Sequence, residues 1–299
     1  MADTSGEADI RGIDINKLAR GFADETLMMK RFVRQSKTKA REIRWYSKTA
    51  GFLDVPDTSG ITASQIANTA HGALPFVTEP SWTRNTSYIR KYFVESPWIS
   101  EEDLKDNDVD ILATTVRDLV RGVSKQVDSR IYNILSGSGT GDPGSAGSVQ
   151  TIAATADGWD DDDTGDPIED IMAAKNLLIS YNYDAEQAVM ILHPDDHKNL
   201  LTYLINVKGS SIPQFSSEKV KTGIVMGLLG IKIAVSSSAT TDFAVLCIPS
   251  VSATYKQFTG LKTAIVSDPG IGKKIRAWEE GECILTDPKS VVVITDTQV

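Results

Sequence analysis

Apolar residues recur at every third or fourth position along residues 109–135, and this is the clearest pattern in the chain. Such spacing places the apolar side chains on one face of a helix. It predicts an amphipathic helix of about 28 residues, with Asn107 or Asp108 as its N-cap. The apolar positions are Val109, Leu112, Val116, Leu119, Val123, Val127, Ile131 and Leu135.

The region before this helix changes character at residue 51. The composition of residues 1–23 predicts little regular structure. The spacing of apolar and charged residues predicts a helix from about residue 24 to 48. Turn-forming residues follow in 51–65, and residues 75–96 are rich in the β-branched and aromatic side chains typical of strands. An extended excursion of about forty residues is long for a loop, and such loops usually carry function.

The second half of the chain alternates strand and helix patterns and then ends in strands. Asp166, Pro167 and Glu169 form a typical helix start, because they supply a cap, a first-turn proline and a capping-box glutamate. The mixture predicts an α+β fold. Strands are expected at 148–156, 187–193, 231–237, 242–249, 262–268, 273–287 and 290–296, and helices at 166–181 and 194–205.

Residues 135–148, LSGSGTGDPGSAGS, contain five glycines directly after the long helix. A phosphate-binding P-loop requires a lysine after its glycines, and none lies between Lys125 and Lys175. A dinucleotide-binding loop requires a strand before the glycines, whereas a helix precedes them here. We therefore interpret the stretch as a flexible bridge between two rigid parts.

Composition excludes several classes of protein. The 299 residues carry a formal net charge of −9, which disfavours sequence-specific DNA binding as the main role. Cys247 and Cys283 lack metal-binding spacing, so we expect two reduced, buried thiols. The N-terminus does not resemble a signal peptide, and the longest apolar stretch, 224–235, is too short to span a bilayer. We expect a soluble protein without a membrane partner.

The chain offers only weak candidates for a catalytic or metal site. Asp160 and Asp162 match early ligand positions of a calcium loop, but Ile171 replaces the glutamate that such a loop requires. His193 and His197 do not have the sequence context of a zinc protease. Since no nucleophile, base and acid can be grouped, we predict no enzyme activity, no catalytic residue and no cofactor.

Basic residues recur at helical spacing in the predicted N-terminal helix. In a helix they lie on one face. Two interpretations stay open: a solvated face, or an arm that lies against an acidic neighbour or a polyanion. The residues are Lys30, Arg34, Lys37, Arg41, Arg44 and Lys48.

Four segments, taken in order, look like parts of one known family. Residues 98–143 look like a spine helix with a serine–acid–leucine lead-in and a glycine-rich exit, and 187–205 look like a strand and helix of an axial domain. Residues 222–240 resemble a G-x-L-x-G-x-x-V segment, and 281–296 resemble closing strands. The ordered set resembles the major capsid protein of tailed bacteriophages and related archaeal viruses, which has the Hong Kong 97-type fold.

The resemblance implies a shell subunit whose long excursion is an E-loop that reaches over a neighbouring subunit. Phe76, Trp82, Tyr88 and Phe93 are then candidate contact anchors, unless they pack within their own subunit. The implied division is 1–52 for an N-terminal arm, 53–93 for the E-loop, 94–160 for the first part of the peripheral domain, 161–254 for the axial domain and 255–299 for closing peripheral strands.

The implied function is self-assembly, as hexamers and pentamers, into an icosahedral virion shell around double-stranded viral DNA. The implied partners are other copies of the chain, a portal, cement proteins and DNA held by non-specific proximity, with assembly in the host cytoplasm. Because only about fifty residues precede the excursion, we expect no maturation cleavage and a separate scaffold protein. Two alternatives are an encapsulin-like cellular nanocompartment shell and a small metal-dependent hydrolase that uses Asp160–Asp166 or the histidines.

Overall fold

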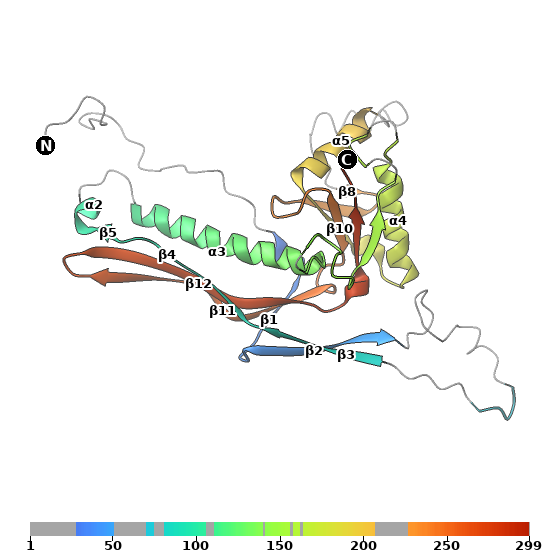
Figure 1. The fold of residues 1–299 in the computed structure, drawn as a ribbon, viewed down its shortest axis with the longest axis horizontal. Helices are drawn as coiled ribbons and strands as arrows, with labels where there is room; N and C mark the ends of the chain where they lie inside the picture. The colour runs from blue at the N-terminus through green and yellow to red at the C-terminus, as the bar shows by residue number, and fades with distance from the viewer. Residues whose placement is uncertain are drawn as a thin grey trace.

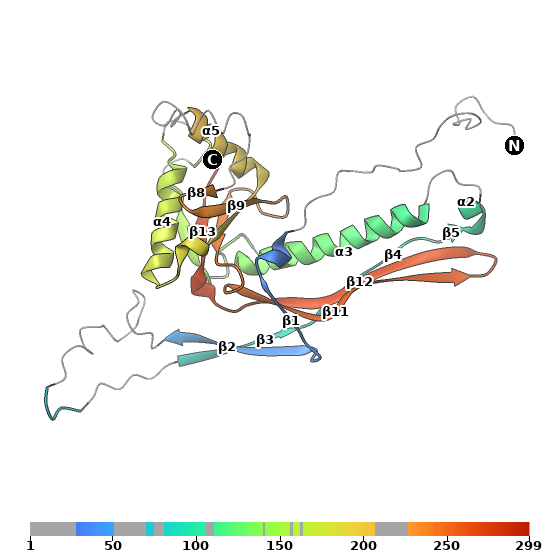
Figure 2. The same cartoon turned by 180° about the vertical axis from the view of Figure 1, so that it is seen from behind.

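A long helix lies along a long two-stranded ribbon, a unit of strands and helices sits at one end of both, and a separate hairpin extends below (Figure 1). The view from behind shows the helix on the same single side of the ribbon (Figure 2). The computed structural model describes residues 28–50, 70–74, 81–105, 111–139, 141–155, 158–161, 164–206 and 227–298.

The long helix, α3, spans Ile111–Leu135 and confirms the predicted amphipathic helix. The proposed caps at positions 107 and 108 lie outside the described residues. Burial is strongest in the second half of the helix, where Val127, Ile131 and Leu135 are fully buried in a core shared with Tyr255. The helix is therefore anchored by its C-terminal half.

α3 packs on a five-stranded sheet of order β1-β11-β12-β4, in which β5 also pairs with β12. The two longest strands, β11 and β12, form the antiparallel ribbon, and β1 joins β11 in parallel. The elements are β1 (Arg34–Lys37), β4 (Arg90–Glu95), β5 (Ile99–Ser100), α2 (Glu101–Lys105), β11 (Ala253–Asp268) and β12 (Gly272–Leu285).

The second unit is a six-stranded sheet of order β6-β13-β10-β7-β9-β8, with helices α4 and α5 packed against it. The predicted helix start is confirmed, since the Asp166 side chain accepts from the amides of Ile168 and Glu169. The elements are β6 (Gln150–Ala153), α4 (Pro167–Ser180), η2 (Ala185–Gln187), β7 (Val189–Leu192), α5 (Pro194–Asn206), β8 (Gly227–Leu228), β9 (Ile231–Val235), β10 (Phe243–Cys247), η3 (Pro288–Ser290) and β13 (Val291–Thr295).

The glycine-rich stretch connects α3 to the six-stranded sheet as predicted, but it is a compact turn and not a flexible bridge. The Gly144 amide donates to the carbonyl of Ser136 over 2.7 Å, and the Ala146 amide donates to Gly137 over 3.0 Å. Gly137 and Gly144 have φ of 62° and 81°, a region that favours glycine. Glycine is therefore required by the shape of a folded turn.

The predicted N-terminal helix is wrong for residues 28–50. A short 3-10 turn, η1 (Met29–Arg31), precedes β1, and β2 (Glu42–Ala50) pairs with β3 (Ser81–Tyr88) in an antiparallel hairpin. The physical reason is long-range strand pairing. The backbone of β1 pairs with β11, which lies more than two hundred residues later in the chain. Spacing along one segment carries no information about such a partner.

The strand pairing also corrects part of the predicted domain division. The prediction assigns 94–160 and 255–299 to one domain, but β6 and β13 pair with each other, and β13 pairs with β10, in the six-stranded sheet. An apolar or alternating pattern shows that a segment is extended, but not which sheet it joins. The rest of the division stays a prediction.

Candidate assembly surfaces

The β2–β3 hairpin binds its own subunit with one face. That face carries Ile43, which is buried, and Trp45, whose Nε1 donates to the carbonyl of Leu285 over 3.1 Å. Asn85 Nδ2 also donates to Ser47 Oγ across the two strands over 2.9 Å. The stem of the hairpin is therefore fixed against the end of β12.

The opposite face of the hairpin is exposed and aromatic. Tyr46, Trp82 and Tyr88 are 63%, 58% and 66% exposed. The register pairs Glu42 with Tyr88 and Lys48 with Trp82, so alternate positions of both strands share this face. We call Tyr46, Trp82 and Tyr88 the hairpin aromatics. Tyr46 lies in the segment predicted as a helix, so its residue pattern did not mark it as a contact residue.

The other predicted contact anchors do not join the hairpin aromatics. Phe93 lies in β4, where it is 49% exposed and its ring centroid is 6.4 Å from that of Trp278. Phe76 lies outside the described residues. The structure therefore brings Trp82 and Tyr88 together on one hairpin, and it places Phe93 on the five-stranded sheet.

The six predicted basic residues do not form one face, because the helix that would align them is absent. Arg34 and Lys37 are exposed on β1, and Lys48 lies on β2. Arg44 Nε lies 2.6 Å from Glu42 Oε1 within β2, and this hydrogen bond holds the pKa of Glu42 below its ordinary value. The predicted basic stripe is thus corrected to separate positions on a turn and two strands.

The remaining two basic residues, Lys30 and Arg41, bind glutamates of β12. Lys30 Nζ lies 2.7 Å from Oε1 of Glu279, which is completely buried. Arg41 Nη2 lies 3.8 Å from Glu280 Oε2, and the guanidinium is 4.9 Å from the ring centroid of Phe258. These cations fasten the N-terminal segment and the start of the hairpin to the sheet.

A third glutamate of β12, Glu282, is also completely buried and binds two arginines. Arg130 of α3 donates to its Oε1 over 2.6 and 2.9 Å, and Arg90 Nε lies 3.0 Å from its Oε2. Burial, and secondarily this carboxylate, raises the pKa of the neighbouring Tyr92 to about 12. The three glutamates were not among the predicted site residues, although the segment WEEGECIL (278–285) is unusual in placing acids within an apolar strand.

Asp128 ties the N-terminal segment to α3. Its Oδ2 accepts from the amides of Met28 and Met29 over 3.0 and 3.3 Å, and Met29 is completely buried beside it. Burial raises the pKa of Asp128, and the two amide hydrogen bonds oppose that shift. The start of the described N-terminal segment is therefore anchored in the core, through Met29 and Val33.

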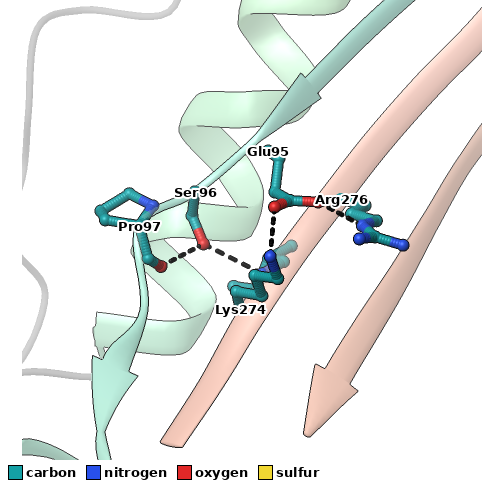
Figure 3. Close-up of polar contacts among 6 residues, drawn as sticks. Glu95, Ser96, Pro97, Lys274 and Arg276 are labelled. Atoms are coloured by element: carbon teal, nitrogen blue, oxygen red, sulfur yellow. Dashed lines mark hydrogen bonds and ion pairs between the residues drawn. The ribbon is translucent and has the colours of Figure 1, made fainter.

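A carboxylate at the end of β4 joins this strand to β12. Glu95 binds the ammonium of Lys274 and the guanidinium of Arg276, and these hydrogen bonds lower its pKa (Figure 3). Beside it, Ser96 Oγ accepts from the amide of Ile275 over 2.9 Å. Glu95 and Ser96 therefore hold the end of β4 against β12 through ion pairs and a hydrogen bond.

The buried acid near the aspartate-rich segment belongs to α4 and not to that segment. Asp160 is exposed, and Asp162 lies outside the described residues. The buried acid is instead Asp170, which accepts from Thr155 Oγ1 over 2.6 Å and from Trp159 Nε1 over 2.8 Å. It thereby holds the loop before α4 against the helix.

The histidine and cysteine positions considered in the sequence lie apart in the structure. His193 Nδ1 accepts from the amide of Asp195 over 3.2 Å, and His197 lies on α5. Cys247 and Cys283 are free and buried, and burial raises the pKa of Cys247 to about 12. Within the described ranges, no group of three or more histidines, cysteines or acids is placed to hold a metal ion.

No helix in the described part of the chain is long and apolar enough to cross a membrane. The surfaces that remain are an exposed aromatic hairpin face and an exposed face of the five-stranded sheet. Exposed aromatic side chains grouped in this way are typical of contact surfaces between macromolecules.

Comparison with known proteins agrees with this geometry. A family model described as phage capsid protein matches residues 98–294. The chain shares 14% identity and a TM-score of 0.67 with a protein of Mycobacterium phage Che8, over 95% of this chain and 97% of that one. With the mature capsid of bacteriophage PhiM1 it shares 12% identity and a TM-score of 0.65, over 95% of this chain and 90% of that one. With a protein of Microbacterium phage Oxtober96 it shares 16% identity and a TM-score of 0.63, over 95% of each chain.

No match was found among curated proteins. At these low identities the structural likeness shows the fold, while the family model covers about two thirds of the chain. Both agree with the resemblance noted in the sequence. The chain is thus a member of the phage capsid protein family, a shell protein with the α+β Hong Kong 97-type fold.

Proposed function

We propose that copies of this chain assemble as hexamers and pentamers into a closed icosahedral shell that encloses double-stranded viral DNA. One observation carries the proposal: the hairpin is fixed to its own subunit through Trp45, yet it presents three aromatic rings to solvent on its other face. Exposed aromatic side chains grouped on a rigid element are typical of a contact surface. A second copy of the subunit is the partner that a shell always supplies.

In this proposal the hairpin and the segment at its tip, residues 51–80, form the E-loop. The six-stranded unit is the axial domain, which meets its copies at the centre of each ring. The five-stranded sheet with α3 is the peripheral domain, which contacts the next ring. The net charge of −9 keeps the wall from binding its DNA tightly, which favours packing and release.

The proposed partners are other copies of the chain, a separate scaffold protein, a portal and cement proteins, with DNA held only by proximity. Assembly would take place in the host cytoplasm. A structural role needs no cofactor or catalytic residue, and the capsid family is one of structural proteins.

The test is the mass and shape of the purified protein, by size-exclusion chromatography with light scattering and by negative-stain electron microscopy. Rings or closed particles are expected, with the proposed scaffold co-expressed if the chain alone stays a monomer of 32.5 kDa. A monomer under both conditions would contradict the proposal. The capsid family match does not favour a cellular nanocompartment shell. Particles filled with a protein cargo instead of DNA would support that alternative function.

A further inference from the structure

One flank of α3 carries cations at regular steps. Arg117, Arg121 and Lys125 follow one another at intervals of four residues, and Asp128 comes three residues later. At 3.6 residues per turn, these four positions lie within about 80° of the helix surface. Arg117 and Lys125 are exposed, Arg121 is partly exposed, and the exposed acid Asp118 lies at the edge of the same surface. We call Arg117, Arg121 and Lys125 the cationic flank.

The same side of the helix changes from buried to exposed at Asp128. Toward the C-terminal end of α3, Tyr132 and Leu135 lie on this side and are 1% and 0% exposed. Toward the N-terminal end, Val120 borders the cationic flank and is only partly buried. An extended segment that lies on this side of the helix therefore finds exposed surface only toward the N-terminal end.

Asp128 fixes the point from which such a segment starts. Its Oδ2 accepts from the amides of Met28 and Met29 over 3.0 and 3.3 Å, and we call this contact the anchor. Met29 is completely buried and packs in the same core as Val127 and Ile131 of α3. The chain that precedes Met28 therefore joins the described residues beside the cationic flank.

The residues that precede the anchor carry the opposite charge. Residues 1–27 contain six aspartates and glutamates but only three lysines and arginines. The two acids nearest to the anchor are Asp24 and Glu25, four and three residues before Met28, and no lysine or arginine lies between Arg20 and Met28. We call residues 24–27 the acidic strap. Its charge is complementary to that of the cationic flank.

The lengths of the two partners match. In an extended chain that spans about 3.4 Å per residue, Glu25 lies about 10 Å from the anchor and Asp24 about 14 Å. An α-helix rises about 1.5 Å per residue, so Arg121 lies about 10 Å from the anchor along the helix axis and Arg117 about 16 Å. Each acid of the strap can therefore be placed beside an arginine of the flank.

We propose that the acidic strap docks on the cationic flank of its own chain, with Glu25 beside Arg121 and Asp24 toward Arg117, and shields these cations from polyanions. Single exposed ion pairs are weak, but the strap is tethered only a few residues from the flank, so its effective concentration there is high. The inference goes beyond the proposed shell function and is tested on the unassembled subunit. In a shell that encloses DNA, the strap would keep α3 from holding the DNA backbone.

Disulfide trapping measures the contact without removing a charge. Thr26→Cys with Ser124→Cys puts one thiol on the strap and one at the edge of the flank, and mild oxidation should close an intrachain disulfide that moves faster on a non-reducing gel. The control, Thr26→Cys with Gln126→Cys, has its second thiol about 160° round the helix and should close about tenfold more slowly. Cys247 and Cys283 are buried, so they interfere little.

A charge swap in the trapping variant tests whether ion pairs hold the strap. Arg117→Glu with Arg121→Glu should slow closure about tenfold, because like charges then meet, and adding Asp24→Lys with Glu25→Lys should restore it. Equal closure of the trapping variant and its control would overturn the inference. So would a disulfide that joins two chains, or closure that the reversal leaves unchanged. If circular dichroism shows that the reversal unfolds the helix, Arg117→Ala with Arg121→Ala replaces it.

Shielding is measured with non-specific double-stranded DNA as the polyanion. Asp24→Asn with Glu25→Gln should uncover the two arginines, so that DNA binds more tightly and the slope of log K against log salt is steeper by about 2. The matched control, Asp3→Asn with Glu7→Gln, makes the same change in net charge far from the anchor and should keep the slope of the wild type. Equal slopes in the two variants would contradict the shielding.

Discussion

Lys30 and Glu279 form an ion pair across 249 positions of sequence, and the carboxylate of that pair has no exposed surface. Lys30 Nζ lies 2.7 and 2.8 Å from the two carboxylate oxygens, and the hydroxyl of Tyr255 donates to Oε1 over 3.0 Å. Burial and the adjacent carboxylate both raise the pKa of Tyr255, so its hydroxyl stays a donor. The N-terminal segment therefore supplies the cation that pairs with a buried carboxylate of the sheet.

Replacing Lys30 with Met should lower the free energy of unfolding of the unassembled subunit by about 3 kcal/mol, because Glu279 is left charged and uncompensated. Urea denaturation followed by tryptophan fluorescence measures the change. The double variant Lys30→Met with Glu279→Gln should lose less than Lys30→Met alone, since no buried charge remains. Equal losses in the two variants would contradict this explanation.

Asp128→Asn should change how stability depends on pH. The folded-state pKa of Asp128 is raised by burial, so the folded state holds the proton more strongly than the unfolded state does. Its contribution to stability is therefore full below the unfolded carboxyl pKa, near 4, and is lost as pH rises through the folded pKa. The amide cannot ionise and still offers an oxygen to the amides of Met28 and Met29. Relative to the wild type, the variant should gain stability between pH 4 and neutrality in urea denaturation, and parallel profiles would show that Asp128 is not the group responsible.

Two glycines of the turn after α3 give a matched pair. Gly144 and Gly147 both have positive φ, 81° and 64°, but a Cβ at 144 would lie 2.5 Å from Thr151 Cγ2, whereas at 147 nothing lies within 4 Å. Gly147→Ala should cost about 1 kcal/mol for the left-handed backbone, and Gly144→Ala about 2–4 kcal/mol because the clash is added. Thermal unfolding of both variants measures the difference. If both substitutions leave the stability of the subunit nearly unchanged, the result would support a flexible bridge instead of a folded turn.

The hairpin offers two tryptophans on opposite faces. Trp82→Ala should leave subunit stability within about 0.5 kcal/mol of the wild type, because the side chain is 58% exposed, but it should reduce assembly. Trp45→Ala should instead lower stability, because it removes a partly buried ring and its hydrogen bond to Leu285. Light scattering and urea denaturation on the same preparations separate the two effects. If Trp82→Ala assembles normally, the hairpin aromatics are not the contact.

Local patterns predicted the helices well because their determinants lie within each segment. The spacing of Val127, Ile131 and Leu135 marks α3, and Asp166 caps α4 through its own neighbours. The prediction for the N-terminal segment failed because the structure of that segment depends on β11 and on Glu279, which are distant in sequence. Ile43 and Trp45 are two positions apart, and this alternating pattern is typical of a strand, but the spacing of the lysines and arginines favoured a helix.

The candidate surfaces were harder to predict than the elements. Trp82 and Tyr88 stand out by residue type, yet only the register with β2 shows that they share a face with Tyr46. The row of Lys262, Trp278 and Phe93 draws its members from three strands of the five-stranded sheet, and no short stretch of sequence contains all of them. Sequence reasoning can nominate such residues singly, whereas their grouping is a property of the strand pairing.

The position of β13 has a consequence for how the protein is made. This strand holds residues 291–295, yet it lies between β6 and β10 inside the six-stranded sheet. A nascent chain that stops before residue 291 therefore leaves β6 without a neighbour and the sheet open in its interior. During translation the unit can close only after its last strand is synthesised. A chain interrupted before residue 291 would therefore lack the closed sheet that the proposed shell needs in every copy.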